Sequence, residues 1–156
     1  MTPSLVNAWK QRGVVFLWRY VENERNYPGW HFTTDAEGAA SLCDLLKAMG
    51  SHPTSSHRTL LVTPPTMSIL GVPNNKGGSA RWTAPEKWRI TYFPEAADTW
   101  HFDGDATLAH LSLGSALLPR LMSATEGIVR GQGDFSIGTS SAKGSELWFW
   151  WQAGAA

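Results

Sequence analysis

The chain has 156 residues, 42% hydrophobic and 17% charged, and its 13 basic and 13 acidic residues cancel to a formal net charge of zero. This length is typical of one domain that folds without a disulfide or metal, so the sequence predicts a single domain over residues 1–156. Clustered Lys and Arg are absent, which excludes the basic surface that nucleic-acid binding requires.

Cysteine content and apolar runs predict the compartment. Cys43 is the single cysteine, so no internal disulfide can form, which fits a reducing environment. The N-terminus has no basic start followed by an apolar run, the pattern of a secretory signal. The longest apolar runs, Val14–Trp18 and Leu147–Trp151, are each five residues, whereas a membrane helix needs about 20. We therefore expect a soluble, cytoplasmic protein with no membrane partner.

The first quarter of the chain predicts a helix, a strand and a loop. Helical spacing after Ser4 indicates a short N-terminal helix that ends at Gly13. The β-branched and aromatic run 14–21 indicates a strand with no wet face, hence a central one. Residues 23–29 are polar and end in Pro-Gly, which is typical of a turn.

The clearest helix of the sequence follows this loop. Thr34 precedes Glu37 by three residues, the spacing of a capping box. Apolar residues then recur at intervals of three and four until Gly50. One face of this helix is expected to pack on a sheet.

The middle of the chain predicts short strands around a long loop. Residues 60–62 form a strand that ends before Pro64-Pro65, and residues 71–85, rich in Gly and Pro, form a surface loop. Alternation over residues 88–93 predicts a strand. Residues 99–112 predict a hairpin about Asp103-Gly104.

The last part of the chain predicts a second long helix over residues 114–130, with Ser115 as its N-cap. Two strands, 134–138 and 146–151, are expected to form a final antiparallel pair. Because strands follow one another along the chain, the sequence predicts an α+β fold: a mainly antiparallel sheet of about six strands, with two long helices and the short N-terminal helix on one face.

Metal and catalytic patterns are weak. His101, Asp103 and Asp105 alternate beside a turn, but an Asp-Gly hairpin needs these residue types for its own geometry. Cys43 lies on the apolar stripe of the first long helix, where packing is the usual role. No phosphate-binding glycine motif, catalytic serine elbow or metal-ligand spacing occurs. We expect no catalytic residue, metal or cofactor, and the sequence favours a non-enzyme without deciding it.

The nine tryptophans depart most from ordinary composition. Trp18, Trp88, Trp148 and Trp150 fall inside predicted strands, where core packing is the simplest interpretation. Trp30 and Trp82, however, border polar loops, and binding residues concentrate on loops that a rigid scaffold holds in place. The candidate ligand-binding residues in and beside these loops are Arg25, Tyr27, Trp30, His31, Lys76, Arg81 and Trp82.

Two functions of different classes remain open. Residues 147–151 are apolar on both faces, so a partner protein or a second copy of the chain should cover the face that the helices leave free. This predicts a non-catalytic interaction protein, analogous in size and composition to a small bacterial inhibitor or immunity protein. The alternative is a small-ligand-binding protein or enzyme with its site between loops 23–31 and 71–82. Carbohydrate recognition by exposed tryptophans is a third hypothesis.

Overall fold

The computed structural model describes residues 4–22, 28–138 and 145–151, which form nine strands, four α-helices and one 3₁₀ helix, η1. The α+β class and the two long helices predicted from the sequence are confirmed. The strands, however, form two mixed sheets and not one mainly antiparallel sheet. In chain order the elements are α1 (Leu5–Ala8), β1 (Val15–Tyr20), β2 (Trp30–Thr34), α2 (Ala36–Ser51), β3 (Ser56–Leu61), α3 (Met67–Leu70), η1 (Asn75–Gly78), β4 (Trp82–Thr83), β5 (Lys87–Phe93), β6 (Trp100–Gly104), β7 (Leu108–Gly114), α4 (Leu118–Val129), β8 (Phe135–Ile137) and β9 (Leu147–Phe149).

The first sheet has the strand order β4-β1-β2-β9-β8. The β2–β9 pair is parallel, with His31 opposite Trp148, and the β8–β9 pair is antiparallel. The predicted final antiparallel pair is thereby confirmed. The last strand lies inside the sheet, between β2 and β8, as its two apolar faces require.

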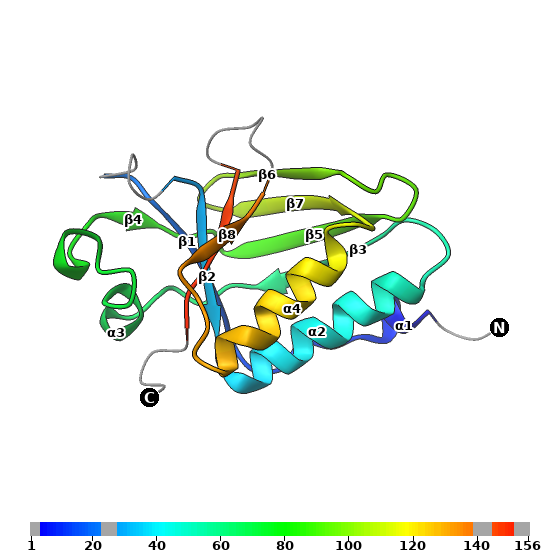
Figure 1. Ribbon diagram of the computed structural model, residues 1–156, viewed down its shortest axis with the longest axis horizontal. Helices are drawn as coiled ribbons and strands as arrows, with labels where there is room; N and C mark the ends of the chain where they lie inside the picture. The colour runs from blue at the N-terminus through cyan, green and yellow to red at the C-terminus, as the bar shows by residue number, and fades with distance from the viewer. Residues whose placement is uncertain (1–3, 23–27, 139–144, 152–156) are drawn as a thin grey trace.

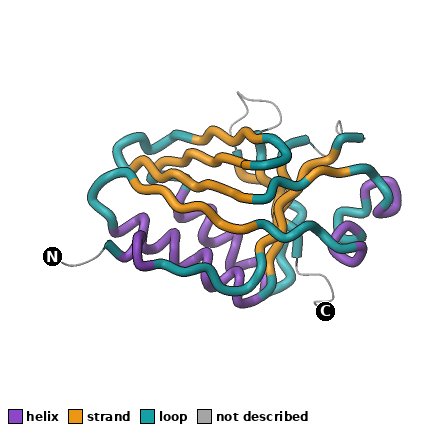
Figure 2. The backbone as a smooth tube through the Cα atoms, turned by 180° about the vertical axis from the view of Figure 1, so that it is seen from behind, coloured by secondary structure: helices purple, strands orange, loops and turns teal. Residues whose placement is uncertain are grey.

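The second sheet has the order β3-β5-β7-β6, so β3 and β6 are its edge strands. The β5–β7 pair is parallel and the other two pairs are antiparallel. Seen from behind, the strands of this sheet lie in front of the helices (Figure 2). Burial alternates along β5 and β7, which leaves Arg89, Thr91, His110 and Ser112 on a solvated polar face.

The long helices α2 and α4 lie side by side on one side of the sheets (Figure 1). The N-cap of α2 is Asp35 and not Thr34, because the Asp35 carboxylate accepts hydrogen bonds from the backbone N–H groups of Gly38 (2.6 Å) and Val14 (3.1 Å). The second helix begins at Leu118 with Leu117 as its N-cap, so the predicted cap at Ser115 is wrong.

The main core lies where the two helices meet the inner faces of both sheets. It contains Trp88 and Leu111 from the second sheet, Leu17 and Phe32 from the first, and Leu46 from α2. The two sheets therefore share one continuous set of buried apolar contacts.

The strand β2 was not predicted. Residues 30–34 appeared to be a loop edge and a helix entry, yet all five are buried, between β1 and β9. A strand that is covered on both faces shows no alternation of polar and apolar residues. The histidine and two threonines of β2 made the segment look polar, so the sequence did not indicate a buried strand.

The predicted loop 71–85 is also partly structured. Together with α3, the segment 67–83 contains η1 and β4. Ile69, Leu70 and Ala80 from this segment pack with Trp18 and Trp150 in a second apolar cluster, on the face of the first sheet opposite the main core. This chain itself thus covers much of the face for which the sequence predicted a second protein. No helix of the described residues is long and apolar enough to cross a membrane.

Candidate functional site

Two of the candidate residues, Arg25 and Tyr27, lie outside the described residues. Trp30 and His31 lie in β2, with 1% and 0% of their surface exposed. Trp30 belongs to the main core, where its ring stacks on Phe102 with 4.9 Å between centroids and the Arg19 guanidinium lies 4.9 Å from its ring centroid. Their predicted position in a loop is therefore wrong, because a buried strand holds both.

His31 lies on the opposite face of β2, surrounded by aromatic rings. Trp18, Trp148 and Trp150 stack near its ring, and Tyr20 meets it edge-on. The Trp150 indole N–H donates to Nδ1 of His31 at 2.9 Å. Since an indole nitrogen can only donate, Nδ1 is an acceptor and carries no proton.

The remaining candidates lie beside Glu22, at the end of β1. Its carboxylate accepts from Lys76 Nζ, from the Arg81 backbone N–H (2.8 Å) and from Arg81 Nε (3.3 Å). The Lys76 hydrogen bond, followed by the Arg81 backbone bond, lowers the Glu22 pKa to about 2. Trp82 pairs with Tyr20 in the β1–β4 register and is half-buried. The structure thus joins Glu22, the residue before the predicted loop 23–31, to two residues of the predicted loop 71–82, and a ligand role for these residues stays a prediction.

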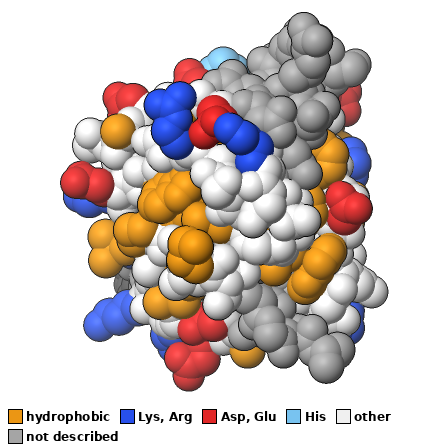
Figure 3. All heavy atoms as spheres, turned by 90° about the vertical axis from the view of Figure 1, so that its left-hand side faces the viewer, with side chains coloured by type: hydrophobic (Ala, Val, Ile, Leu, Met, Phe, Trp, Pro, Cys, Tyr) orange, Lys and Arg blue, Asp and Glu red, His pale blue; other side chains and the backbone are white. Residues whose placement is uncertain are grey.

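The carbohydrate hypothesis requires tryptophan rings that are exposed to solvent. The core interpretation is confirmed for Trp18, Trp88 and Trp150, all buried. Trp82, Trp148 and Trp151 are half-buried beside the second cluster. Figure 3, seen from the side of α3 and β4, shows apolar side chains gathered on that face.

The acidic turn and the cysteine have structural roles. Asp105 accepts backbone bonds from Thr107 (2.8 Å) and Leu108 (2.9 Å), with the Leu108 bond first in lowering its pKa. His101 lies 3.1 Å from Asp103. Among the described residues no group of three or more His, Cys, Asp or Glu could hold a metal. Burial raises the Cys43 pKa to about 11, with Glu126 and Asp44 adding to it.

The edge strand β3 has backbone groups that point away from its sheet and that another chain could bind. The Val62 backbone N–H donates to Glu86 across the β3–β5 pair at 3.0 Å. Because the backbone groups of successive residues point to alternate sides of a strand, Leu60 and Arg58 also face β5. The backbone N–H and C=O groups of Thr59 and His57 therefore point away from the sheet.

Two residues at the far end of this edge already have partners. The Thr63 N–H donates to the Val15 carbonyl at 2.8 Å. The Gln11 side chain accepts from the Leu61 N–H at 2.8 Å and donates to the Leu61 carbonyl at 2.9 Å. Further along, no described residue bonds the outward backbone groups of Thr59 and His57. They form an open strand edge.

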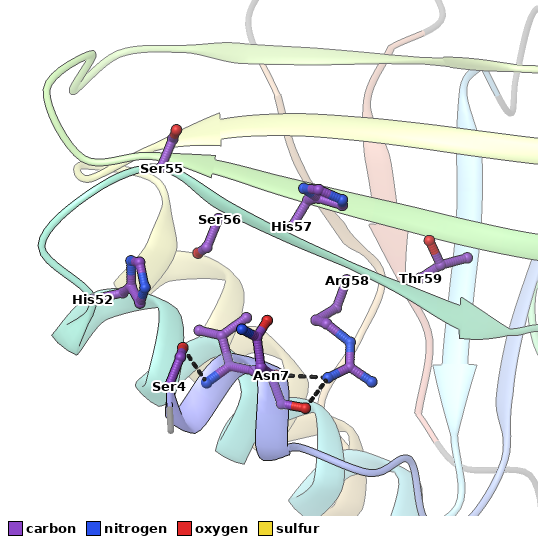
Figure 4. Close-up of a pocket in the computed structure, with 9 residues that line it drawn as sticks. Ser4, Asn7, His52, Ser55, Ser56, His57, Arg58 and Thr59 are labelled. Atoms are coloured by element: carbon purple, nitrogen blue, oxygen red, sulfur yellow. Dashed lines mark hydrogen bonds between the residues drawn. The ribbon is translucent and has the colours of Figure 1, made fainter. Parts of the chain in front are cut away.

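This edge borders a groove of about 670 Å³ between β3 and α1. Figure 4 shows Ser56 and Arg58 pointing toward α1, and Ser55, His57 and Thr59 pointing to the other side of the strand. Arg58 Nη1 donates to the carbonyls of Val6 (2.6 Å) and Asn7 (3.0 Å). The groove is lined by Ser4, Val6, Asn7, His52, Ser55, Ser56, His57, Arg58 and Thr59.

Sequence reasoning missed this site. The predicted strand covered residues 60–62, whereas β3 begins at Ser56. The polar residues 56–59 resemble a loop because one strand edge and one sheet face are open. The sequence of β3 has no polar and apolar alternation, since four polar residues, 56–59, are followed by the apolar pair Leu60 and Leu61, so no local signal favoured a longer strand.

Comparisons with known proteins give no relative. The chain matches no family model, no curated protein and no solved structure.

Proposed function

We propose that this chain is a non-catalytic protein-binding protein that holds an extended segment of its partner against the open edge of β3. The observation that supports this proposal is that the outward backbone groups of Thr59 and His57 have no partner among the described residues and border a groove. An added strand would lie about 4.8 Å from β3 and satisfy these backbone groups.

The Gln11 contact supports this proposal from within the molecule. A planar amide already donates and accepts at Leu61, two residues along the same edge. A peptide bond offers the same donor and acceptor. The strand edge therefore has the chemistry to continue this pairing onto another chain.

A partner protein, and not a second copy, is the occupant that we favour. Two copies joined edge to edge about a two-fold axis would bring the positively charged Arg58 of one groove toward that of the other, and charges of equal sign repel. An inhibitor or immunity role, with a toxin or enzyme as partner, is one form of this proposal. A cytoplasmic location is also proposed, supported by the single cysteine.

The experiment uses a displayed library of linear peptides, selected on the immobilised protein. Thr59→Pro removes the outward N–H without removing a bond to β5, and proline is tolerated at such an edge position. Thr59→Val keeps the N–H and is the matched control. Selected peptides should bind the wild type and Thr59→Val with similar affinity. Their affinity for Thr59→Pro should be at least about tenfold lower, because a carbonyl of the docked peptide can no longer accept a hydrogen bond from the backbone N–H of residue 59. Equal binding to both variants would refute strand addition at this edge.

A further inference from the structure

We infer that the β3 groove selects an acidic extended segment, an inference that rests on the proposed function. The groove lining contains one arginine and two histidines, and no Asp or Glu. Its charge is therefore of one sign, and a negatively charged partner segment complements it.

Arg58 and His57 lie on opposite faces of β3, beside its open edge. Arg58 points toward α1, and the His57 side chain points to the other side (Figure 4). Side chains of an added strand alternate between the same two faces. A segment with acidic residues on the α1 side would therefore meet Arg58, and one with an acidic residue on the other side would meet His57.

Arg58 has donors available for this contact. Nη1 serves the carbonyls of Val6 and Asn7, and the guanidinium carbon lies 5.4 Å from the centroid of the Trp9 ring. These contacts fix the guanidinium at the groove. Nε and Nη2 make no hydrogen bond with described residues, and Arg58 forms no salt bridge with them. A fixed, uncompensated arginine is well suited to bind a carboxylate.

The test is an NMR titration of the full chain with three capped seven-residue peptides. They alternate valine with glutamate, with threonine or with lysine, and differ in charge while sharing strand propensity. The glutamate peptide should shift the His57 and Thr59 amide signals with an affinity about 3–10-fold higher than the threonine peptide, and the lysine peptide should bind more weakly still. Added salt should reduce these differences.

Variants assign the preference to Arg58. Arg58→Gln keeps a donor for the α1 carbonyls but removes the charge, so it should abolish the preference for glutamate. Arg58→Lys keeps the charge and should keep the preference, which separates charge from any effect on folding. Arg120→Gln, an exposed arginine on α4, makes the same charge change elsewhere and should leave the preference intact.

The contrary outcomes separate the two claims. Equal affinity for all three peptides at the His57 and Thr59 amides would overturn the acidic preference and leave strand addition standing. Shifts of these amides by none of the peptides would count against strand addition itself. Broadening of the same amides with rising concentration of the free protein would identify a second copy as the occupant and overturn the inference.

Discussion

The side-chain amide of Gln11 bonds both backbone groups of Leu61, accepting from the N–H at 2.8 Å and donating to the carbonyl at 2.9 Å, although 50 residues separate them in the chain. Gln11 thus occupies the place of a neighbouring strand residue at one end of the β3 edge. Beyond it, Thr59 and His57 present the same backbone groups to the groove.

Removing this amide should lengthen the open edge. Gln11→Ala leaves the Leu61 N–H and carbonyl to water, with an expected loss of stability of about 1 kcal/mol or less because Leu61 is exposed. The Leu61 amide should then exchange with solvent faster than in the wild type. Native-state hydrogen exchange measures this rate, and an unchanged Leu61 rate would mean that Gln11 does not protect the edge.

The His31 and Trp150 contact makes a stability prediction. Trp150→Ala should destabilise the fold by about 3–5 kcal/mol, because it removes a buried indole. Trp150→Phe keeps most of the apolar volume but removes the buried hydrogen bond from the indole N–H to Nδ1 of His31, which should cost about 1–3 kcal/mol.

Trp148→Phe is the comparison for this series. Its indole N–H donates to the Pro28 carbonyl at 2.8 Å in a half-buried position. Water can replace that donor, so Trp148→Phe should cost less than Trp150→Phe. Urea denaturation measures the free energy of unfolding of all three variants. A larger loss for Trp148→Phe than for Trp150→Phe would contradict the contribution assigned to the hydrogen bond between Trp150 and His31.

Glu22 predicts a pH dependence. Its pKa falls from 4.5 to about 2 on folding, chiefly through Lys76 and then through Arg81. The folded state therefore favours the carboxylate, whose contribution to stability is present above pH 4.5 and is lost as pH falls toward 2. Between these values, Glu22→Gln should lose less stability with falling pH than the wild type does. Thermal melts across this range measure the slopes, and parallel curves would exclude the Glu22 contribution.

We expect the thiol of Cys43 to be alkylated slowly in the folded protein. With its pKa raised from 9.0 to about 11, the thiol holds roughly 100-fold less thiolate at pH 8 than an ordinary cysteine. Iodoacetamide should modify the native protein at least that much more slowly than the urea-unfolded protein, as followed by mass spectrometry. Equal rates would place the thiol in solvent.

The sequence predicted elements whose patterns are local. The hairpin about Asp103-Gly104 and the periodic helix before Gly50 are both present, although β6 runs through Gly104 and the turn follows it. β2 was missed because His31 and Thr33 are buried polar residues. The rings that cover His31 include Trp148 and Trp150, which lie more than a hundred positions away. Long-range pairing overrode the local pattern.

The candidate site was harder to predict for the same reason. The edge position of β3 depends on the strand order of the whole sheet. No local pattern of residues 56–59 shows which backbone groups stay unpaired, since that depends on Gln11, Val15 and β5. The polar character of this segment was visible in the sequence, but its binding geometry required the fold.

Hydrogen exchange at the β3 edge tests strand addition most directly. In the free protein, the Arg58 and Leu60 amides should be protected, because they face β5, and the His57 and Thr59 amides should exchange rapidly. A peptide selected on wild type should slow exchange at His57 and Thr59 and leave Arg58 and Leu60 little changed. Protection of His57 and Thr59 in the free protein, or rapid exchange there in the saturated complex, would contradict strand addition at this edge.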